Sequence, residues 1–155
     1  MPTVWRIVKA RYARSAFDGE GARLHGGRWN SPGNPVVYTS DSPALAALET
    51  LAGLNNSALL SSFVLIPVSL PEVTVQTLDT AALPPSWRSF PSPPELAALG
   101  DAWLRAAKSL ALRVPSAVIE QQFNYLLNPR HPRFEKLAIG PARGFAFDER
   151  LLEDS

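Results

Sequence analysis

The pattern of apolar and polar residues predicts several short strands and two main helices. Strands are expected at residues 4–8, 36–38, 63–68, 73–76, 114–119, 136–139 and 144–147, where apolar residues cluster between prolines, glycines and polar residues. Residues 73–76 follow the 63–68 segment after only a short turn, so we expect those two strands to be neighbours. Clustered strands with two main helices indicate an α+β fold.

The first main helix has clear boundary signals. Ser42 is a typical N-cap residue, Pro43 suits the first helical position, and Gly53 lies near the expected end. Its alanines and leucines leave it apolar nearly all round, which predicts burial. The second helix is predicted over residues 95–112, with a stripe of apolar side chains at helical spacing (Leu96, Leu99, Trp103, Ala106 and Leu110) that we interpret as core.

A proline-rich segment, residues 83–94, separates the two halves of the chain. It contains PPSWRSFPSPP and is too rich in proline for regular structure, so it is interpreted as a surface loop. Trp87 and Phe90 lie within it. Exposed aromatic side chains there would indicate a partner-binding surface, whereas folding back onto the core is the simpler alternative.

Composition narrows the functional classes. The chain has 155 residues and is predicted to be one domain spanning residues 1–155. A formal net charge of +1 gives no sign of general nucleic-acid binding, and the absence of cysteine excludes disulfides and cysteine zinc sites. His25 and His131 are isolated, so no metal site is expected. We also expect no signal peptide or membrane span, and therefore a cytoplasmic protein.

Candidate chemistry concentrates in residues 26–49. Arg28 follows two glycines, an arrangement that lets the backbone approach a ligand while the guanidinium holds a phosphate. Glu49 is the only charged residue from Pro43 to Leu60, so its carboxylate must find a donor, shift its pKa or face a cavity. Arg6 in the first strand points either to solvent or into a cleft. Three further arginines, Arg11, Arg14 and Arg23, are interpreted as solvated loop charges.

As a set, the motifs GGRWNSPG, VVYTS, ALAALE, VPSAVI and NYLLNPRHP resemble the RES-domain toxins of bacterial toxin–antitoxin pairs. The matching positions are Arg28, Tyr38, Glu49, Ser116 and the segment 124–129, and the resemblance runs from about Trp5 to about Phe147. It implies a fold related to ADP-ribosyltransferases and an activity that consumes NAD as substrate. It also implies a cognate Xre-type helix-turn-helix antitoxin, in assemblies of two of each chain or a multiple of that.

Within that resemblance, each matched residue has an expected role. Glu49 would stabilise the cationic ribose, Arg28 would hold the pyrophosphate or a ribose, and Tyr38 would stack on nicotinamide. Ser116 and Asn124 would donate or accept hydrogen bonds around the ribose or the carboxamide. Taken singly, these residues also have ordinary interpretations: an ion-paired helix glutamate, a turn arginine, a core aromatic, a strand serine bonded to the backbone, and an asparagine that caps a turn.

Three functions remain open from the sequence. The chain is expected to be a toxin that splits the nicotinamide–ribose bond of NAD, with water or phosphate as acceptor. The alternatives are a transferase that attaches ADP-ribose to a protein, and a non-catalytic module that binds a partner. For the first, we expect the antitoxin to inhibit by covering or entering the NAD site, and not by acting at a distance.

Overall fold

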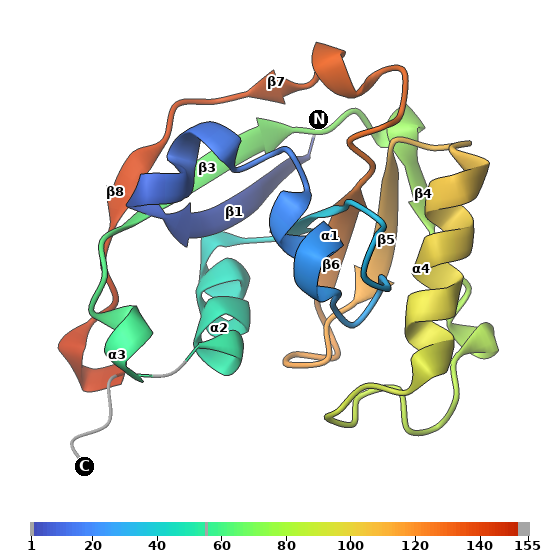
Figure 1. Cartoon of the computed structure of the whole chain (residues 1–155), viewed down its shortest axis with the longest axis horizontal. Helices are drawn as coiled ribbons and strands as arrows, with labels where there is room; N and C mark the ends of the chain where they lie inside the picture. The colour runs from blue at the N-terminus through green and yellow to red at the C-terminus, as the bar shows by residue number, and fades with distance from the viewer. Residues whose placement is uncertain (1, 55, 152–155) are drawn as a thin grey trace.

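The fold is built on one mixed β-sheet, with helices packed against it (Figure 1). The computed structural model describes residues 2–54 and 56–151. The strands are β1 (Thr3–Lys9), β2 (Val37–Ser40), β3 (Phe63–Ser69), β4 (Val75–Thr77), β5 (Ala111–Pro115), β6 (Phe123–Leu127), β7 (Ala138–Ile139) and β8 (Arg143–Phe145). The α-helices are α1 (Glu20–His25), α2 (Pro43–Gly53), α3 (Asn56–Leu59) and α4 (Pro94–Ala106). Short 3-10 turns occupy Ala10–Ser15, Glu72–Thr74, Thr80–Ala82, Phe134–Lys136 and Glu149–Leu151.

The strand order is β4-β5-β6-β2-β1-β3-β7, and β8 also pairs with β3. Only β4 and β5 run parallel; the other neighbours are antiparallel. The α+β prediction is therefore confirmed. The centre of the sheet is the pairing of β2 with β6, which sets Tyr38 opposite Leu126 and Ser40 opposite Asn124. This register matters for function because it puts polar side chains from two strands on the same face.

Two apolar clusters cover opposite sides of the central strands, as the alternation along β5 shows. Leu112 packs with Leu96 and Trp103 of α4, whereas the preceding Ala111 packs with Leu127 and other strand residues on the other side. A third cluster joins β3 to the end of the chain, where the rings of Phe63 and Phe147 meet edge to face at 5.2 Å. The sheet is thus buried on both faces at its centre.

Three sequence predictions about element positions were wrong. Residues 73–76 do not form a neighbour of the 63–68 strand, because β4 lies at the other end of the sheet, where it pairs with β5. The predicted helix 95–112 ends at Ala106, since Ala107 adopts a left-handed conformation with φ of 50°. The strand predicted at 114–119 is β5, which begins at Ala111 and ends at Pro115. Leu110 joins the core from the loop and not from the helix.

The expected burial of the first helix also needs correction. The helix begins at Pro43, and the Ser42 side chain accepts a hydrogen bond from the Leu45 backbone N–H, so the cap was predicted correctly. Of its residues only Leu45 and Ala46 are buried, while Leu48 is exposed. The helix packs one face on β1 and β2, and its many alanines make the solvent side only weakly apolar. Of the helices in residues 2–54 and 56–151, none is long and apolar enough to cross a membrane.

The close approach of α4 to residue 29 gives a stability prediction. A Cβ at Gly100 would lie 1.7 Å from the Trp29 backbone oxygen, a distance that no side-chain motion can relieve. We expect Gly100→Ala to lower the free energy of unfolding by about 2 kcal/mol or more, despite the better helix propensity of alanine. Gly144→Ala is the control, since its Cβ would meet nothing within 4 Å. Urea unfolding measures both, and equal stabilities would contradict the packing described.

Candidate active site

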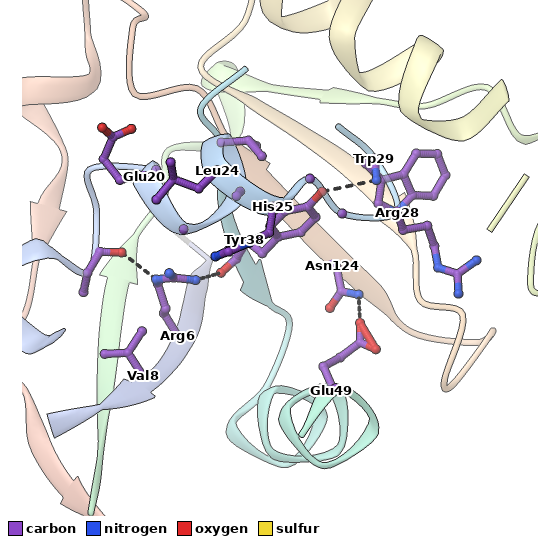
Figure 2. A pocket seen from close by; sticks show the side chains of 18 of the residues that line it. Arg6, Val8, Glu20, Leu24, His25, Arg28, Trp29, Tyr38, Glu49 and Asn124 are labelled. Atoms are coloured by element: carbon purple, nitrogen blue, oxygen red, sulfur yellow. Dashed lines mark hydrogen bonds between the residues drawn. The ribbon is translucent and has the colours of Figure 1, made fainter. Parts of the chain in front are cut away.

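A cavity of about 900 Å³ opens between β1, α1, the turn before β2, α2 and the start of β6. Its lining includes four of the residues singled out from the sequence: Arg28, Tyr38, Glu49 and Asn124. Figure 2 shows Glu49 and Asn124 directed at each other, with the Arg28 side chain extending on the same side of the pocket. Within the described residues no group of three or more histidine, cysteine or acidic side chains is arranged to hold a metal ion.

The turn that carries Arg28 is a compact, hydrogen-bonded unit. Gly26 has a φ of 73°, which favours glycine, and the Gly27 N–H donates to the Asn30 carbonyl at 2.9 Å. The buried Asn30 side chain donates to the Ala22 and Asn34 carbonyls at 2.9 and 3.0 Å. Trp29 points into the core beside α4. Arg28 is therefore presented from a rigid turn and not from a mobile loop.

Tyr38 fixes this turn from the neighbouring strand. Its hydroxyl donates to Asn30 Oδ1 at 2.6 Å and accepts from the Trp29 N–H at 3.2 Å. A Cβ on residue 27 would lie 2.7 Å from the same hydroxyl, so this contact favours glycine at position 27. Burial raises the pKa of Tyr38, which keeps the hydroxyl neutral and able to donate. The ring lines the cavity while the hydroxyl serves the turn.

Helix α4 braces the same turn from behind. Asp101 Oδ1 accepts from the Ser31 N–H at 3.0 Å, and the absence of a side chain at Gly100 lets the helix contact the Trp29 backbone. Burial opposes ionisation of Asp101, but hydrogen bonds from Ser31 and Asn34 and the positive charge of Arg105 together outweigh it, so the pKa of Asp101 lies below the ordinary value. Asp101 thus stays a charged acceptor that holds the turn in place.

The Arg28 guanidinium is only partly engaged by the protein. Its Nη1 donates to the carbonyls of Trp87 and Ser89, at 2.8 and 3.0 Å. Partial burial lowers its pKa, and the negative charge of Glu49 opposes that effect. No hydrogen bond from its Nε or Nη2 to the described residues is present. A guanidinium with two free donor positions at a cavity wall is suited to bind an anion.

Glu49 is held by a short chain of polar contacts. The Ser40 hydroxyl donates to Asn124 Oδ1 at 2.7 Å, and Asn124 Nδ2 donates to Glu49 Oε2. Because the serine fixes the acceptor end of the amide, the donor end must face the carboxylate. Burial raises the pKa of Glu49, while the Asn124 hydrogen bond and the charge of Arg28 partly offset that rise. The Glu49 carboxylate is therefore held in one orientation by Asn124, while its negative charge is only partly balanced by the protein.

Arg6 is the site residue that sequence reasoning left undecided. Its Nε donates to the Ala16 carbonyl at 2.6 Å and its Nη1 to the Tyr38 carbonyl at 2.9 Å, and it lines the cavity. Burial lowers its pKa to about 10, and the negative charge of Asp18 partly opposes this. A lone arginine within the apolar strand 4–8 was the available signal, but which face it occupied depended on strand pairing.

With this geometry in view, the comparisons with known proteins identify the family. Residues 3–148 match the RES domain. The chain belongs to the RES-domain family. It is 40% identical to "Toxin Res" of Yersinia enterocolitica over 149 residues, covering 96% of this chain and 98% of that protein. It is 32% identical to the "Prs ADP-ribosylating toxin" of a Sphingobium species, covering 96% of this chain and 95% of that protein.

The fold of this RES domain also matches a solved structure. The Mycobacterium tuberculosis MbcT–MbcA toxin–antitoxin complex contains a chain that aligns with a TM-score of 0.72 and 24% sequence identity. The alignment covers 93% of this chain and 84% of that one. At that identity the likeness shows the fold, which is the one that the sequence motifs implied.

Ser116, a matched position of the RES motifs, does not line the cavity. It is fully buried, and its hydroxyl accepts from the backbone N–H groups of Val118 and Ile119, each at 3.1 Å. Its own N–H donates to the Gln122 carbonyl at 2.9 Å. The serine therefore shapes a turn, and it is the following residues, Ala117 and Val118, that reach the cavity wall.

The other arginines of the RES domain lie outside the cavity lining. Arg23 forms an exposed ion pair with Glu20, one turn away on the short helix α1, and Arg11 and Arg14 are exposed. These three charges are solvated as predicted, but they lie on short helices and not in a loop. The helix α1 itself was not predicted, because a six-residue helix between glycines gives too short an apolar pattern to recognise.

The environment of Glu49 gives a titration prediction. We expect NMR of the side-chain carboxyl to give a pKa above the ordinary 4.5, and Asn124→Ala to raise it further, because a donor to the charged form is lost. Gln121→Ala removes an exposed amide from the loop before β6 and serves as control. Titration of Glu49 at or below 4.5 would contradict the described burial.

The same shift fixes the sign of a stability effect. A carboxyl whose pKa is higher in the folded than in the unfolded protein contributes stability below about pH 4.5, and that contribution is lost as the pH rises through the folded-state value. At pH 7 the ionised Glu49 is therefore a cost to the fold. A neutral glutamine at this position should leave the fold intact.

Proposed function

We propose that this protein is a toxin that cleaves the nicotinamide–ribose bond of NAD. The observation that carries the proposal is the pairing of Glu49 with Asn124 in a cavity that also presents two arginines. An isolated, oriented carboxylate suits a reaction in which positive charge develops on a sugar. The arginines suit a pyrophosphate.

The proposed reaction needs little acid catalysis. The C1′–N bond breaks and its electron pair leaves with nicotinamide, which departs as a neutral molecule. Positive charge appears on the ribose ring, where Glu49 would stabilise it and accept a hydrogen bond from a ribose hydroxyl. An oxygen of water or phosphate then bonds to C1′ and its proton passes to solvent. A single carboxylate is enough for these reaction steps.

The remaining residues have positioning roles in this proposal. Arg28 would bind the pyrophosphate through Nε and Nη2, and buried Arg6 would support it with Nη2. Tyr38 would offer its ring to nicotinamide, since its hydroxyl already serves the turn. Asn124 would bind a ribose hydroxyl while it orients Glu49. Ser116 would act through the turn that brings Ala117 and Val118 to the cavity, and not by direct contact with NAD.

A second candidate function is transfer of ADP-ribose to a protein. The name of the Sphingobium relative, an ADP-ribosylating toxin, favours it. The bond that breaks is the same, and only the acceptor differs. Mass spectrometry of proteins incubated with the toxin and NAD separates the two, because only transfer leaves an adduct. Purified protein that releases no nicotinamide from NAD would leave the third alternative, a non-catalytic binding module.

The decisive variant for cleavage is Glu49→Gln. We expect it to fold normally and to reduce nicotinamide release about a hundredfold or more, because the shape is kept while the charge is lost. Glu95→Gln in the exposed first turn of α4 is the matched control and should cleave NAD normally. Product analysis with and without phosphate identifies the acceptor. Near-normal turnover by folded Glu49→Gln would remove this carboxylate from the mechanism.

We further propose that an Xre-type antitoxin restrains the toxin in the cytoplasm, because an uncontrolled NAD-degrading enzyme would harm its own cell. The solved structural neighbour is part of a toxin–antitoxin complex, which supports an antitoxin partner. Exposed Tyr12 and Leu24 line the mouth of the cavity and would give that partner an apolar rim. Inhibition would then come from direct occlusion.

Occlusion makes NAD and the antitoxin competitors. We expect a non-hydrolysable NAD analogue to weaken antitoxin binding, and Leu24→Ala to weaken it as well. Calorimetry with the purified pair measures both effects, and Val73→Ala is the control, because Val73 is also an exposed apolar residue but lies outside the cavity lining. Undiminished antitoxin binding with the analogue at saturation would rule out direct occlusion.

A further inference from the structure

The two aromatic residues of the proline-rich segment behave differently. Trp87 is partly buried and packs against the core cluster under α4, as the simpler alternative predicted. Phe90, three residues later, is 93% exposed and yet lines the cavity. No described contact explains an apolar ring held at that place. The segment lies at the foot of α4 in Figure 1.

Side-chain hydrogen bonds anchor the segment around Phe90 to the glycine-rich turn and to the turn after β5. Arg28 donates to the Trp87 and Ser89 carbonyls, and Arg88 Nε donates to the Ala117 carbonyl at 3.0 Å. The Ser89 hydroxyl donates to the Pro91 carbonyl at 3.3 Å. Prolines 84, 85, 91 and 93 further restrict the backbone. The ring is thus exposed on a fixed support, which lowers the entropy cost of binding a ligand.

The position of Arg28 indicates what that ligand is. Its Nη1 is bonded to the residue directly before Phe90, while Nε and Nη2 stay free for a phosphate. A phosphate held there would lie near Ser89, which directly precedes Phe90 in the sequence. A dinucleotide carries a base on each side of its pyrophosphate, and Glu49 with Tyr38 lines the part of the cavity proposed for nicotinamide. The other base needs a second aromatic surface, and Phe90 is a cavity-lining aromatic residue next to the residue that Arg28 holds.

We propose that Phe90 stacks on the adenine of NAD and so contributes binding affinity for the adenylate half of the dinucleotide. This inference rests on the proposed function of the same cavity. The Phe90 ring offers a flat apolar face without a hydrogen-bonding group. It can therefore stack on the purine but cannot form hydrogen bonds with the edge of the base. Its contribution is to binding and not to the bond-breaking step.

The test compares two halves of the substrate. ADP-ribose carries the adenylate half, and nicotinamide mononucleotide carries the other. Dissociation constants are measured by calorimetry in the Glu49→Gln background, so that neither ligand is turned over. We expect Phe90→Ala to weaken ADP-ribose binding about tenfold, in line with the loss of one base–aromatic stack, and to leave nicotinamide mononucleotide unchanged. Phe90→Trp should restore ADP-ribose binding, and Phe90→Leu should not.

Val73→Ala is the control, because Val73 is 87% exposed but outside the cavity lining, and it should change neither constant. The inference is overturned if ADP-ribose does not bind, if Phe90→Ala leaves its affinity unchanged, or if both ligands weaken equally. It is also overturned if only nicotinamide mononucleotide weakens. Nicotinamide release from NAD by the unsubstituted protein tests the proposed function separately, so that failure of one is distinguished from failure of the other.

Discussion

The hydrogen bonds of the Tyr38 hydroxyl hold the site together. One strand residue donates to Asn30 and accepts from the Trp29 N–H, so the turn that carries Arg28 is locked to the sheet. The bond requires glycine at position 27 and a neutral hydroxyl, and burial supplies the second condition by raising the pKa of Tyr38. This contact acts together with the Asn30 side chain and Asp101, which hold the same turn, and it joins the turn to the strand that lines the cavity.

A second constraint is electrostatic. Glu49, Arg6 and Arg28 are all partly removed from water. Burial raises the pKa of the carboxyl group and lowers the pKa of both guanidinium groups, so in each case it favours the neutral form. The protein offsets this cost only in part, through the Asn124 amide and the attraction between Arg28 and Glu49. Charged groups whose burial is only partly offset by the protein are stabilised when a ligand of complementary charge binds in the cavity. The proposed dinucleotide substrate would offer a pyrophosphate to the arginines and a developing sugar cation to the carboxylate.

The two arginine-bearing segments also link the site to its rim. Arg28 ties the glycine-rich turn to the proline-rich segment, and Arg88 ties that segment to the turn that Ser116 stabilises. One side of the cavity is therefore built from three parts of the chain, joined by side-chain hydrogen bonds to backbone carbonyls. This arrangement explains how a buried serine outside the cavity belongs to the same motif set as Arg28 and Glu49.

The sequence by itself determined the α+β class, the capped helix from Pro43, and the strands at 4–8 and 63–68. Local signals were sufficient for these elements, because caps, turns and alternation act over a few residues. The choice of Arg28, Tyr38, Glu49 and Asn124 came instead from the resemblance of the whole motif set to a family, and the structure brings these four residues to one cavity. Tertiary structure decided the rest. Strand pairing placed β4 beside β5, and the left-handed backbone conformation of Ala107 ended α4 earlier than predicted. The register of the strands directed Arg6 into the cavity. Whether Ser116 faced a ligand or its own turn, and whether Trp87 or Phe90 was buried, depended on contacts between segments far apart in the chain, which no local pattern encodes.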